Sequence, residues 1–273
     1  MRTSVVKSKL ARNEPVLVFC CHFTDPSAHE LASLLGFDCL WLDLEHHATT
    51  LETAGNLIRA ARIGAADVVA RPAKGEFMRM ARLLEQGAAG IMYPRCDSAA
   101  EAAEVVKWAK FPPLGRRGID CANPDMPYLL MPMPEYLAAA NAQTFLVVQL
   151  EDPEAVERAD EIAAVPGIDV LFLGVGDFTS LSGFPGKFDH PEVEKAVQRV
   201  AAAAKKAGIH WGMPCFSPEH GRRLLSMGAR FLAHGADIVL LKAGLERIRT
   251  EFAGLGFTFA PTFGGPAAPA PPV

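Results

Sequence analysis

The stretch FLVVQLEDPEAVERADEIAAVPGIDVLFLGVGD, residues 145–177, decides the fold. It begins with the apolar run 145–148 and ends with a second one, 170–173, and each run stops at polar or glycine residues. Between them, Asp152 and Pro153 suit the N-cap and the first position of a helix. A buried strand, a helix and a second buried strand in this order predict a parallel βαβ unit.

Two carboxylates mark the carboxyl end of this unit. Glu151 follows the first strand, after Gln149, and Asp177 follows the second, after Gly174 and Gly176. Because the carboxyl ends of parallel strands meet at one edge of a sheet, these carboxylates are expected to lie close together, where their oxygens suit a hard divalent cation. Acids after strands are also common helix caps, so at this point a capping role for Asp177 stays equally open.

The size and charge of the chain bound its class. It has 273 residues, 50% of them hydrophobic, and a formal net charge of −4. This length fits a single α/β barrel, and the weak charge gives no reason to expect a nucleic acid or a membrane as partner. No apolar run approaches the ~20 residues of a membrane helix, so we expect a cytoplasmic small-molecule enzyme. Its six cysteines show no CxxC pairing and are expected to be reduced.

The alternation of strand and helix continues along the chain. Expected strands cover residues 16–20, 39–43, 67–70, 90–93, 145–148, 170–173, 210–213 and 230–233, with helices at 26–35, 51–63, 76–85, 99–110, 135–142, 191–207, 218–227 and 237–252. Eight such repeats predict a (β/α)8 TIM barrel over residues 1–253, with its catalytic residues at the carboxyl ends of the strands. The Gly/Pro/Ala-rich tail 254–273 cannot build a core and is expected to be mobile.

One connection is too long for an ordinary barrel. Residues 111–134 are rich in proline and glycine and contain Gly115-Arg116-Arg117-Gly118. Loops of this length inside compact domains usually have a function. We therefore expect an active-site loop or a subunit contact here.

The polar residues at the predicted strand ends form a constellation. Asp43, Glu45 and His46 follow the second strand and Arg71 the third, on the same rim as the carboxylates of the βαβ unit. Asp43 is expected to orient His46 as a general base, with His47 facing solvent, and an arginine can stabilise an oxyanion. Taken singly, His46 could be a surface loop residue and Arg71 a salt-bridging strand terminus. Four strands place complementary polar side chains on one rim of the barrel, and this favours the catalytic interpretation.

These residues resemble a known family. Asp43-Leu-Glu-His46, Arg71-Pro72, the 112–118 run Pro-Pro-Leu-Gly-Arg-Arg-Gly, Gln149-Leu-Glu151 and Gly174-Val-Gly-Asp177 are similar to the motifs of the HpcH/HpaI aldolases, the metal-dependent class II pyruvate aldolases. The resemblance extends over roughly residues 17–248, in the order that the family has.

The resemblance implies an activity and a site. The reaction would be the reversible aldol cleavage of a 4-hydroxy-2-oxo acid to pyruvate and an aldehyde, through a metal-bound pyruvate enolate. Glu151 and Asp177 would ligate Mg²⁺, Mn²⁺ or Co²⁺. Arg71 would face the enolate oxygen, and His46, oriented by Asp43, would transfer protons. Substrate contacts would come from Gln149, Gly174, Val175, Gly176 and Arg71. The resemblance also implies a hexamer, a trimer of dimers that exchange their last helix, here residues 237–252.

The chain departs from the family in two places. Gly174-Val-Gly-Asp177 stands where the family has Gly-Pro-Ala-Asp, so a rigid proline is missing beside the second expected ligand. His22-Phe23 after the first strand and Cys215-Phe216 after the seventh place unusual groups on the aldehyde side, so the aldehyde cannot be copied from a relative. His22 is a candidate third acid/base group, weighed against a plain loop role.

Three alternatives remain. One is another metal-enolate lyase, either an acyl-CoA ester lyase of the citrate lyase β type or a phosphoenolpyruvate mutase relative, although no basic groove for CoA is evident. The second is a barrel that binds a 2-oxo acid without catalysis, which would not need a base such as His46. The third, a phosphate-binding isomerase, would need glycine-rich loops after strands seven and eight, where residues 213–217 offer no glycine.

Overall fold

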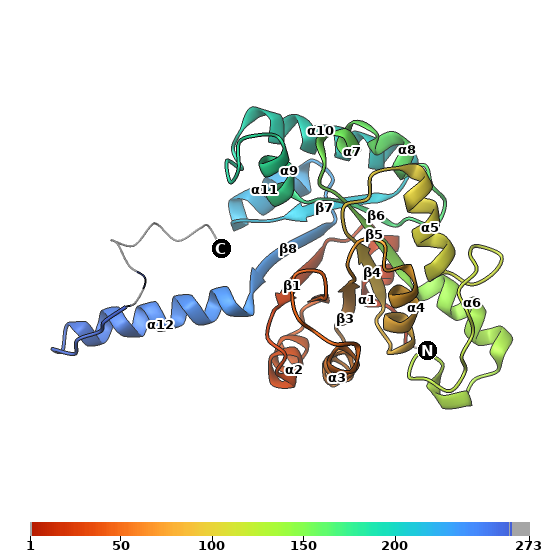
Figure 1. The fold of residues 1–273 in the computed structure, drawn as a ribbon, viewed down its shortest axis with the longest axis horizontal. Helices are drawn as coiled ribbons and strands as arrows, with labels where there is room; N and C mark the ends of the chain where they lie inside the picture. Colours follow the sequence, from red (N-terminus) through yellow and green to blue (C-terminus); the bar gives the residue numbers. More distant parts are fainter. Residues whose placement is uncertain (1, 262, 264–273) are drawn as a thin grey trace.

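A computed structural model describes residues 2–261 and 263 of the chain. Eight parallel strands pair in sequence order and close into a barrel, which confirms the predicted (β/α)8 fold (Figure 1). The strands are β1 Val16–Cys21, β2 Cys39–Asp43, β3 Asp67–Arg71, β4 Gly90–Tyr93, β5 Phe145–Leu150, β6 Val170–Leu173, β7 His210–Pro214 and β8 Phe231–Ala236.

Helices surround the barrel in the expected alternation. They are α1 Val5–Ala11, α2 Pro26–Leu34, α3 Leu51–Ala61, α4 Phe77–Glu85, α5 Ala99–Ala109, α6 Met133–Gln143, α7 Pro153–Glu157, α8 Ala159–Ala163, α9 Val175–Leu181, α10 Pro191–Ala207, α11 Pro218–Ser226 and α12 Asp237–Ala253. Among the described residues, no helix combines the length and the apolar character that crossing a membrane requires.

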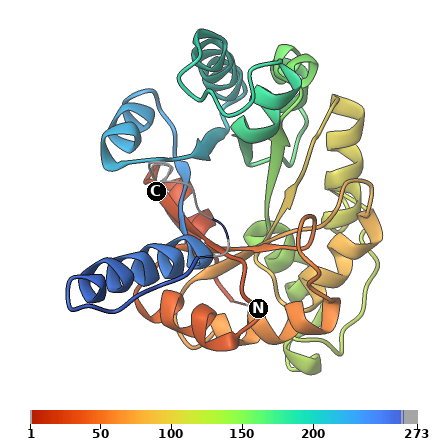
Figure 2. The ribbon, with the colours of Figure 1, turned by 60° about the vertical axis from the view of Figure 1, so that its left-hand side comes forward.

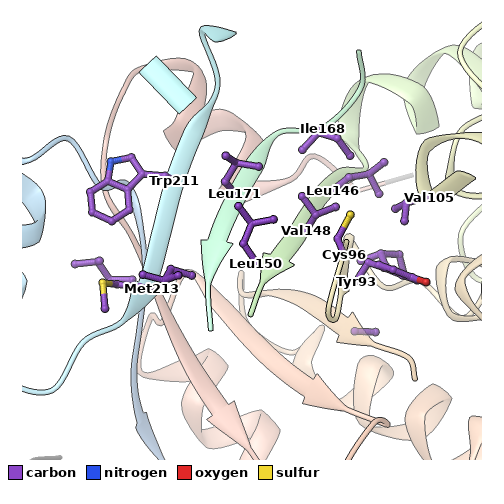
Figure 3. Close-up of a cluster of buried hydrophobic side chains, with 14 of the residues drawn as sticks. Tyr93, Cys96, Val105, Leu146, Val148, Leu150, Ile168, Leu171, Trp211 and Met213 are labelled. Carbon is purple, nitrogen blue, oxygen red and sulfur yellow. The ribbon is translucent and has the colours of Figure 1, made fainter. Parts of the chain in front are cut away.

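The two-residue period of the strands separates two cores. On β5, Leu146, Val148 and Leu150 point outward and pack under the helices, as Figure 3 shows for this part of the barrel. Phe145 and Val147 point inward and fill the barrel together with side chains of the other strands. Alternate residues of a strand face opposite sides, so Gln149 continues the inward row. The parity of each strand thus decides which of its terminal residues reach the barrel mouth.

The amino-terminal end of the barrel is closed by α1, which the sequence did not predict. Val6 and Leu10 of this helix are buried against the inward-facing core. The buried carboxylate of Asp67, the first residue of β3, accepts hydrogen bonds from the Ser4 hydroxyl at 2.6 Å and from the Val6 N–H at 2.9 Å. A helix of seven residues with two core contacts gives little periodic signal in the sequence.

Two connections differ in detail from the expectation. Asp152 is the N-cap of α7 and Pro153 begins the helix, as predicted, but the Asp152 carboxylate makes no capping hydrogen bond and lies 3.3 Å from Arg95. The crossover helix is broken into α7 and α8. Segment 111–134 lies beside the amino-terminal ends of the strands, where the Pro124 carbonyl accepts from Arg62 after α3. It is therefore remote from the carboxylate rim of its own chain. The alternative role, a contact with another subunit, is not tested.

Helix α12 extends away from the barrel in Figures 1 and 2, and Asp237 is its one buried residue. Six large apolar side chains on it are exposed: Leu240, and the stripe Ile238, Leu241, Leu245, Ile248 and Phe252, which recur every three or four residues. Leu31, Leu34 and the C-cap residue Leu35 have the spacing of one apolar face on α2, but all three are exposed, and the helix buries His29, Ala32 and Ser33 instead. The mobility expected for residues 254–273 falls in part on 262 and 264–273, which lie outside the described residues.

Candidate active site

Asp43 and Arg71 end two neighbouring strands and are joined at the barrel mouth. Both are inward-facing residues in register on β2 and β3, and both are buried. Arg71 donates from Nε to one carboxylate oxygen of Asp43 at 3.0 Å and from Nη2 to the other at 2.6 Å. Burial acts to raise the pKa of Asp43, but the hydrogen bonds and charge of Arg71 outweigh it and lower that pKa. The pair is therefore a fixed, charged unit.

Three further groups hold the Arg71 guanidinium. It lies 4.6 Å from the centre of the Trp41 ring, one inward position lower on β2. Its Nη1 donates to the Gln149 side-chain oxygen at 3.3 Å, and the Glu45 carboxylate approaches Nε to 3.2 Å. A guanidinium has five N–H donors, so donors remain on its free edge for a substrate oxygen. Arg71 and Gln149 thus lie together, as the sequence predicted.

Glu151 continues the inward row of β5 and is 4% exposed. Its carboxylate accepts from the Gln149 amide at 3.2 Å and from the Arg95 backbone N–H at 3.0 Å. Burial raises the pKa of Glu151 to about 7; the charge of Arg71 lowers it in part, and Asp177 raises it further. Two neutral hydrogen-bond donors leave this buried carboxylate without a close cationic partner.

Gly174 leaves room for Glu151. A Cβ built on Gly174 would lie 2.2 Å from Oε1 of Glu151, so the carboxylate occupies the space that any other residue's side chain would fill. Asp177 lies in the first turn of α9, which begins at Val175. Glu151 lies against Gly174, and Asp177, three residues further along the chain, is close enough for its charge to raise the pKa of Glu151.

The donor set fits a hard divalent cation. Buried carboxylates are normally paired or bind metals, and Glu151 with Asp177 offers only oxygen ligands. In the described part of the chain, no group of three or more His, Cys, Asp or Glu residues is arranged to hold a metal ion. Such a cation would therefore need most of its remaining ligands from water or from substrate oxygens.

The structure corrects the expected partner of His46. Asp43 does not contact His46; it binds Arg71 and the Glu45 backbone N–H, and the imidazole nearest to it belongs to His47, with 3.8 Å from Nε2 to Oδ2. The His46 side chain is 60% exposed, and its Nε2 lies 3.6 Å from the Glu45 carboxylate. His47, expected to face solvent, is instead the more buried of the two at 36%. Side-chain torsions after a strand end are not readable from residue spacing.

A second polar cluster, formed by His22, His47 and Asp237, lies at the barrel mouth on the side away from Glu151. Of this cluster, the sequence identified only His22 as a candidate acid/base group. The buried Asp237 carboxylate accepts from the backbone N–H of His22 and of Phe23, and the Nδ1 of His22 lies 3.2 Å from it. The other face of the His22 ring meets His47, with 4.7 Å between ring centroids. Asp237 follows β8 directly, so the sign that identified Glu151 and Asp177, an acid after a strand, also marks this residue.

The other unusual residues of the aldehyde side turn away. Cys215 is buried, with its sulfur 3.2 Å from the Ser217 carbonyl oxygen. Phe216 stacks between Phe188 and His220, with ring centroids at 4.9 and 5.3 Å. The expectation that Cys215 and Phe216 lie beside the aldehyde is therefore less well supported than the same expectation for His22.

Residues 17–243 match the family described as HpcH/HpaI aldolase/citrate lyase. A hydroxypyruvate/pyruvate aldolase of Delftia acidovorans is 33% identical over 89% of this chain and 91% of its own length. A 5-keto-4-deoxy-D-glucarate aldolase of Klebsiella pneumoniae is 30% identical over 90% and 95%. Among solved structures, an HpcH/HpaI aldolase of Desulfitobacterium hafniense has a TM-score of 0.85 at 27% identity, covering 95% of this chain and 98% of the other.

Proposed function

The chain belongs to the HpcH/HpaI aldolase/citrate lyase family, and from this premise we propose that it cleaves a 4-hydroxy-2-oxo acid reversibly to pyruvate and an aldehyde. It is a carbon–carbon lyase. The observation that carries the proposal is the buried Glu151 beside Gly174, facing Arg71 across the mouth of one barrel. The charge of Arg71 acts on the pKa of Glu151, and an anionic oxygen ligand with a fixed cationic donor nearby supports cleavage through an enolate.

Glu151 and Asp177 are the proposed ligands of a divalent cation, Mg²⁺, Mn²⁺ or Co²⁺. Both side chains offer only oxygen atoms as ligands, and burial raises the pKa of Glu151; both observations support this assignment. The bound cation would supply Lewis acidity toward the oxygens of the 2-oxo acid. The need for deprotonated ligands couples cation binding to loss of the Glu151 proton.

The 2-oxo acid is positioned by groups of this chain. Backbone N–H groups of Val175 and Gly176 at the start of α9 are the proposed contacts for its carboxylate. The N–H of Gly174, also expected there, already donates to the Leu150 carbonyl oxygen at 3.0 Å. A Cβ on Gly176 would meet nothing within 4 Å, so the space above this turn is open. Arg71 donates to the keto oxygen as that oxygen gains the negative charge of the enolate. Hydrogen bonds to Asp43 and to the Gln149 side-chain oxygen hold the guanidinium in position.

His46 is the proposed proton-transfer group, with Glu45 in place of Asp43 as its partner. In cleavage it accepts the proton of the C4 hydroxyl, the C3–C4 bond breaks, and the electron pair of that bond becomes the enolate of pyruvate. The C4 carbon leaves as the aldehyde, and the His46 imidazolium returns its proton to C3 of the enolate, which gives pyruvate and the neutral base again. Because Glu45 also approaches Arg71 at 3.2 Å, one carboxylate links the base to the oxyanion donor.

Lys74 and Lys242 lack the apolar surroundings that a Schiff-base lysine needs. Lys74 forms an ion pair with Asp97, and Lys242 lies on the exposed α12 beside Glu246 at 2.8 Å. Neither is desolvated in the barrel, as an activated amine requires. The rival lyases and the non-catalytic barrel would share the carboxylate site, but a binding protein has no use for a base beside the oxyanion donor.

A homo-oligomer is part of the proposal. The exposed apolar stripe of α12 and the exposed leucines of α2 are surfaces that a monomer would leave in water. We propose that α12 packs on a second copy of the chain, in a hexamer built as a trimer of dimers. Cytoplasmic location is likewise a proposal, in keeping with six cysteines that are all free.

The test uses the purified protein with Mn²⁺, pyruvate and a panel of aldehydes. Aldol formation should vanish with EDTA and return on addition of Mn²⁺, Co²⁺ or Mg²⁺. Borohydride treatment in the presence of pyruvate should leave the mass of the chain unchanged. A covalent pyruvyl-lysine adduct would exclude the metal-dependent mechanism.

A further inference from the structure

The Asp237–His22 pair fixes one nitrogen of an imidazole at the barrel mouth. The Asp237 carboxylate is 8% exposed and accepts hydrogen bonds from three backbone N–H groups, those of His22, Phe23 and Ile238. It also lies 3.2 Å from Nδ1 of His22. An ionised carboxylate only accepts, so Nδ1 carries the proton of that bond and Nε2 is left as the free position of the ring.

The loop after β1 is thus tied to the start of α12 by a single carboxylate, and the His22 side chain is 29% exposed. Its ring is tilted by 59° against His47, 4.7 Å away between centroids. His47 in turn lies 3.8 Å from the Asp43 carboxylate that holds Arg71. The second cluster therefore adjoins the catalytic groups without sharing the metal carboxylates.

The position of this cluster relates it to one half of the substrate. In the closed barrel, β1 lies four strands from β5 in either direction, so His22 is across the mouth from Glu151. If the pyruvate half is held at β5 and β6, as the proposed function has it, the aldehyde half must extend toward β1, β2 and β8. Besides the groups already assigned to proton transfer and to the Arg71 pair, His22 and His47 lie at the ends of β1 and β2 there, in contact with each other.

We propose that His22 is a specificity-determining residue that binds a hydroxyl group of the aldehyde half. Substrates of this class are hydroxyaldehydes, favoured over alkyl aldehydes of the same length. A hydroxyl both donates and accepts, so it matches Nε2 whether that nitrogen is free or protonated. Asp237 acts as the positioning residue, because it fixes the ring and its tautomer.

The experiment compares glycolaldehyde with acetaldehyde, which differ by one hydroxyl, as acceptors for pyruvate with Mn²⁺. Exchange of the pyruvate methyl protons with D₂O, followed by NMR, reports the pyruvate half alone. His22→Phe keeps a ring but removes both nitrogens. It should reduce kcat/KM for glycolaldehyde roughly tenfold, the loss of one hydrogen bond, while acetaldehyde and methyl exchange change little.

Two further variants test whether the loss comes from the His22 ring nitrogens. His22→Gln retains a polar group near the position of Nε2 and should restore part of the glycolaldehyde preference. His210→Phe makes the same change at the start of β7, at the opposite end of the barrel, and should leave the preference unaltered. Unfolding curves followed by circular dichroism would identify a variant that fails to fold. If His22→Phe does not fold, His22→Gln is compared with the wild type, and its preference for glycolaldehyde should fall in the same direction by a smaller amount.

Other outcomes overturn the inference. An unchanged preference in His22→Phe would show that the ring does not contact the hydroxyl. Equal slowing of both aldehydes with intact methyl exchange would give His22 a general role instead of a specific one. Absence of methyl exchange in the metal-loaded wild-type protein would contradict the proposed function itself, and this inference with it.

Discussion

Asp43 binds Arg71 with both of its carboxylate oxygens, at 3.0 and 2.6 Å, from the neighbouring strand. The pair is buried, and the planar guanidinium can meet a planar carboxylate in this way where an ammonium cannot. Asp43 therefore fixes Arg71, the proposed oxyanion donor, and is not available to orient His46.

Arg71→Lys should lower kcat for cleavage by roughly 10²-fold, because a positioned oxyanion donor acts mainly in the transition state. The KM for the 2-oxo acid should change much less. Steady-state kinetics separate the two constants. A loss confined to KM would assign Arg71 to substrate binding alone.

Gly174→Ala should abolish cation binding, since its Cβ would be placed 2.2 Å from Oε1 of Glu151 and displace that carboxylate. Gly176→Ala is the matched control, because a Cβ there meets nothing within 4 Å. Titration with Mn²⁺ followed by electron paramagnetic resonance measures both. Equal affinity in the two variants would mean that Glu151 is not a ligand, or that it moves freely.

His46→Ala should slow C–C cleavage by roughly 10²–10⁴-fold, the range for a positioned acid or base. Mn²⁺ affinity should persist, because the imidazole is not a proposed ligand. Glu45→Gln should give a milder loss of the same kind, since its carboxylate lies 3.6 Å from His46.

His47→Ala is the comparison for that prediction. It leaves the contact between Glu45 and His46 in place and should therefore retain most of the cleavage rate. A severe loss in His47→Ala with an active His46→Ala would transfer the base role to His47, whose Nε2 lies 3.8 Å from Asp43.

Asp67 should make stability depend on pH. Burial raises its pKa from 3.8 to about 6, against hydrogen bonds from Ser4 and Val6 that lower it. The folded state then binds the proton more tightly than the unfolded state, so this contribution is full below pH 4 and is lost as the pH rises through 6. Relative to Asp67→Asn, the wild type should lose about 1 kcal/mol of unfolding free energy between pH 5 and 7.5. Urea titrations at the two pH values provide the measurement, and a constant difference would contradict it.

Leu241→Glu combined with Leu245→Glu should reduce the size of the assembly, because both side chains lie on the exposed apolar stripe of α12. Lys242→Glu changes charge on the same helix without removing apolar area and serves as control. Light scattering after size-exclusion chromatography gives the mass of each. An unchanged mass in the double variant would remove α12 from the subunit contact.

Much of the site could be read from the chain because strand parity and strand order are local properties. Alternation along β5 places Gln149 inward, and Glu151 follows it in the same row, while parallel pairing brings Glu151 beside Gly174. These relations need only the positions of the apolar runs. For the same reason the closed barrel, and the gathering of carboxylates at the carboxyl ends of its strands, were predictable.

Tertiary structure decided what depends on side-chain torsions and on distant partners. Asp43 lies three positions from His46 yet binds Arg71, because a buried guanidinium from the next strand outcompetes an exposed imidazole. His22 meets Asp237 only because the closing of the barrel brings β8 beside β1. The leucines of α2 form a regular apolar face in the sequence, but regularity does not say whether that face turns to the barrel or away from it. Here His29, Ala32 and Ser33 are buried in their place, and the Ser33 hydroxyl donates to the Ala61 carbonyl oxygen of the neighbouring helix at 2.7 Å.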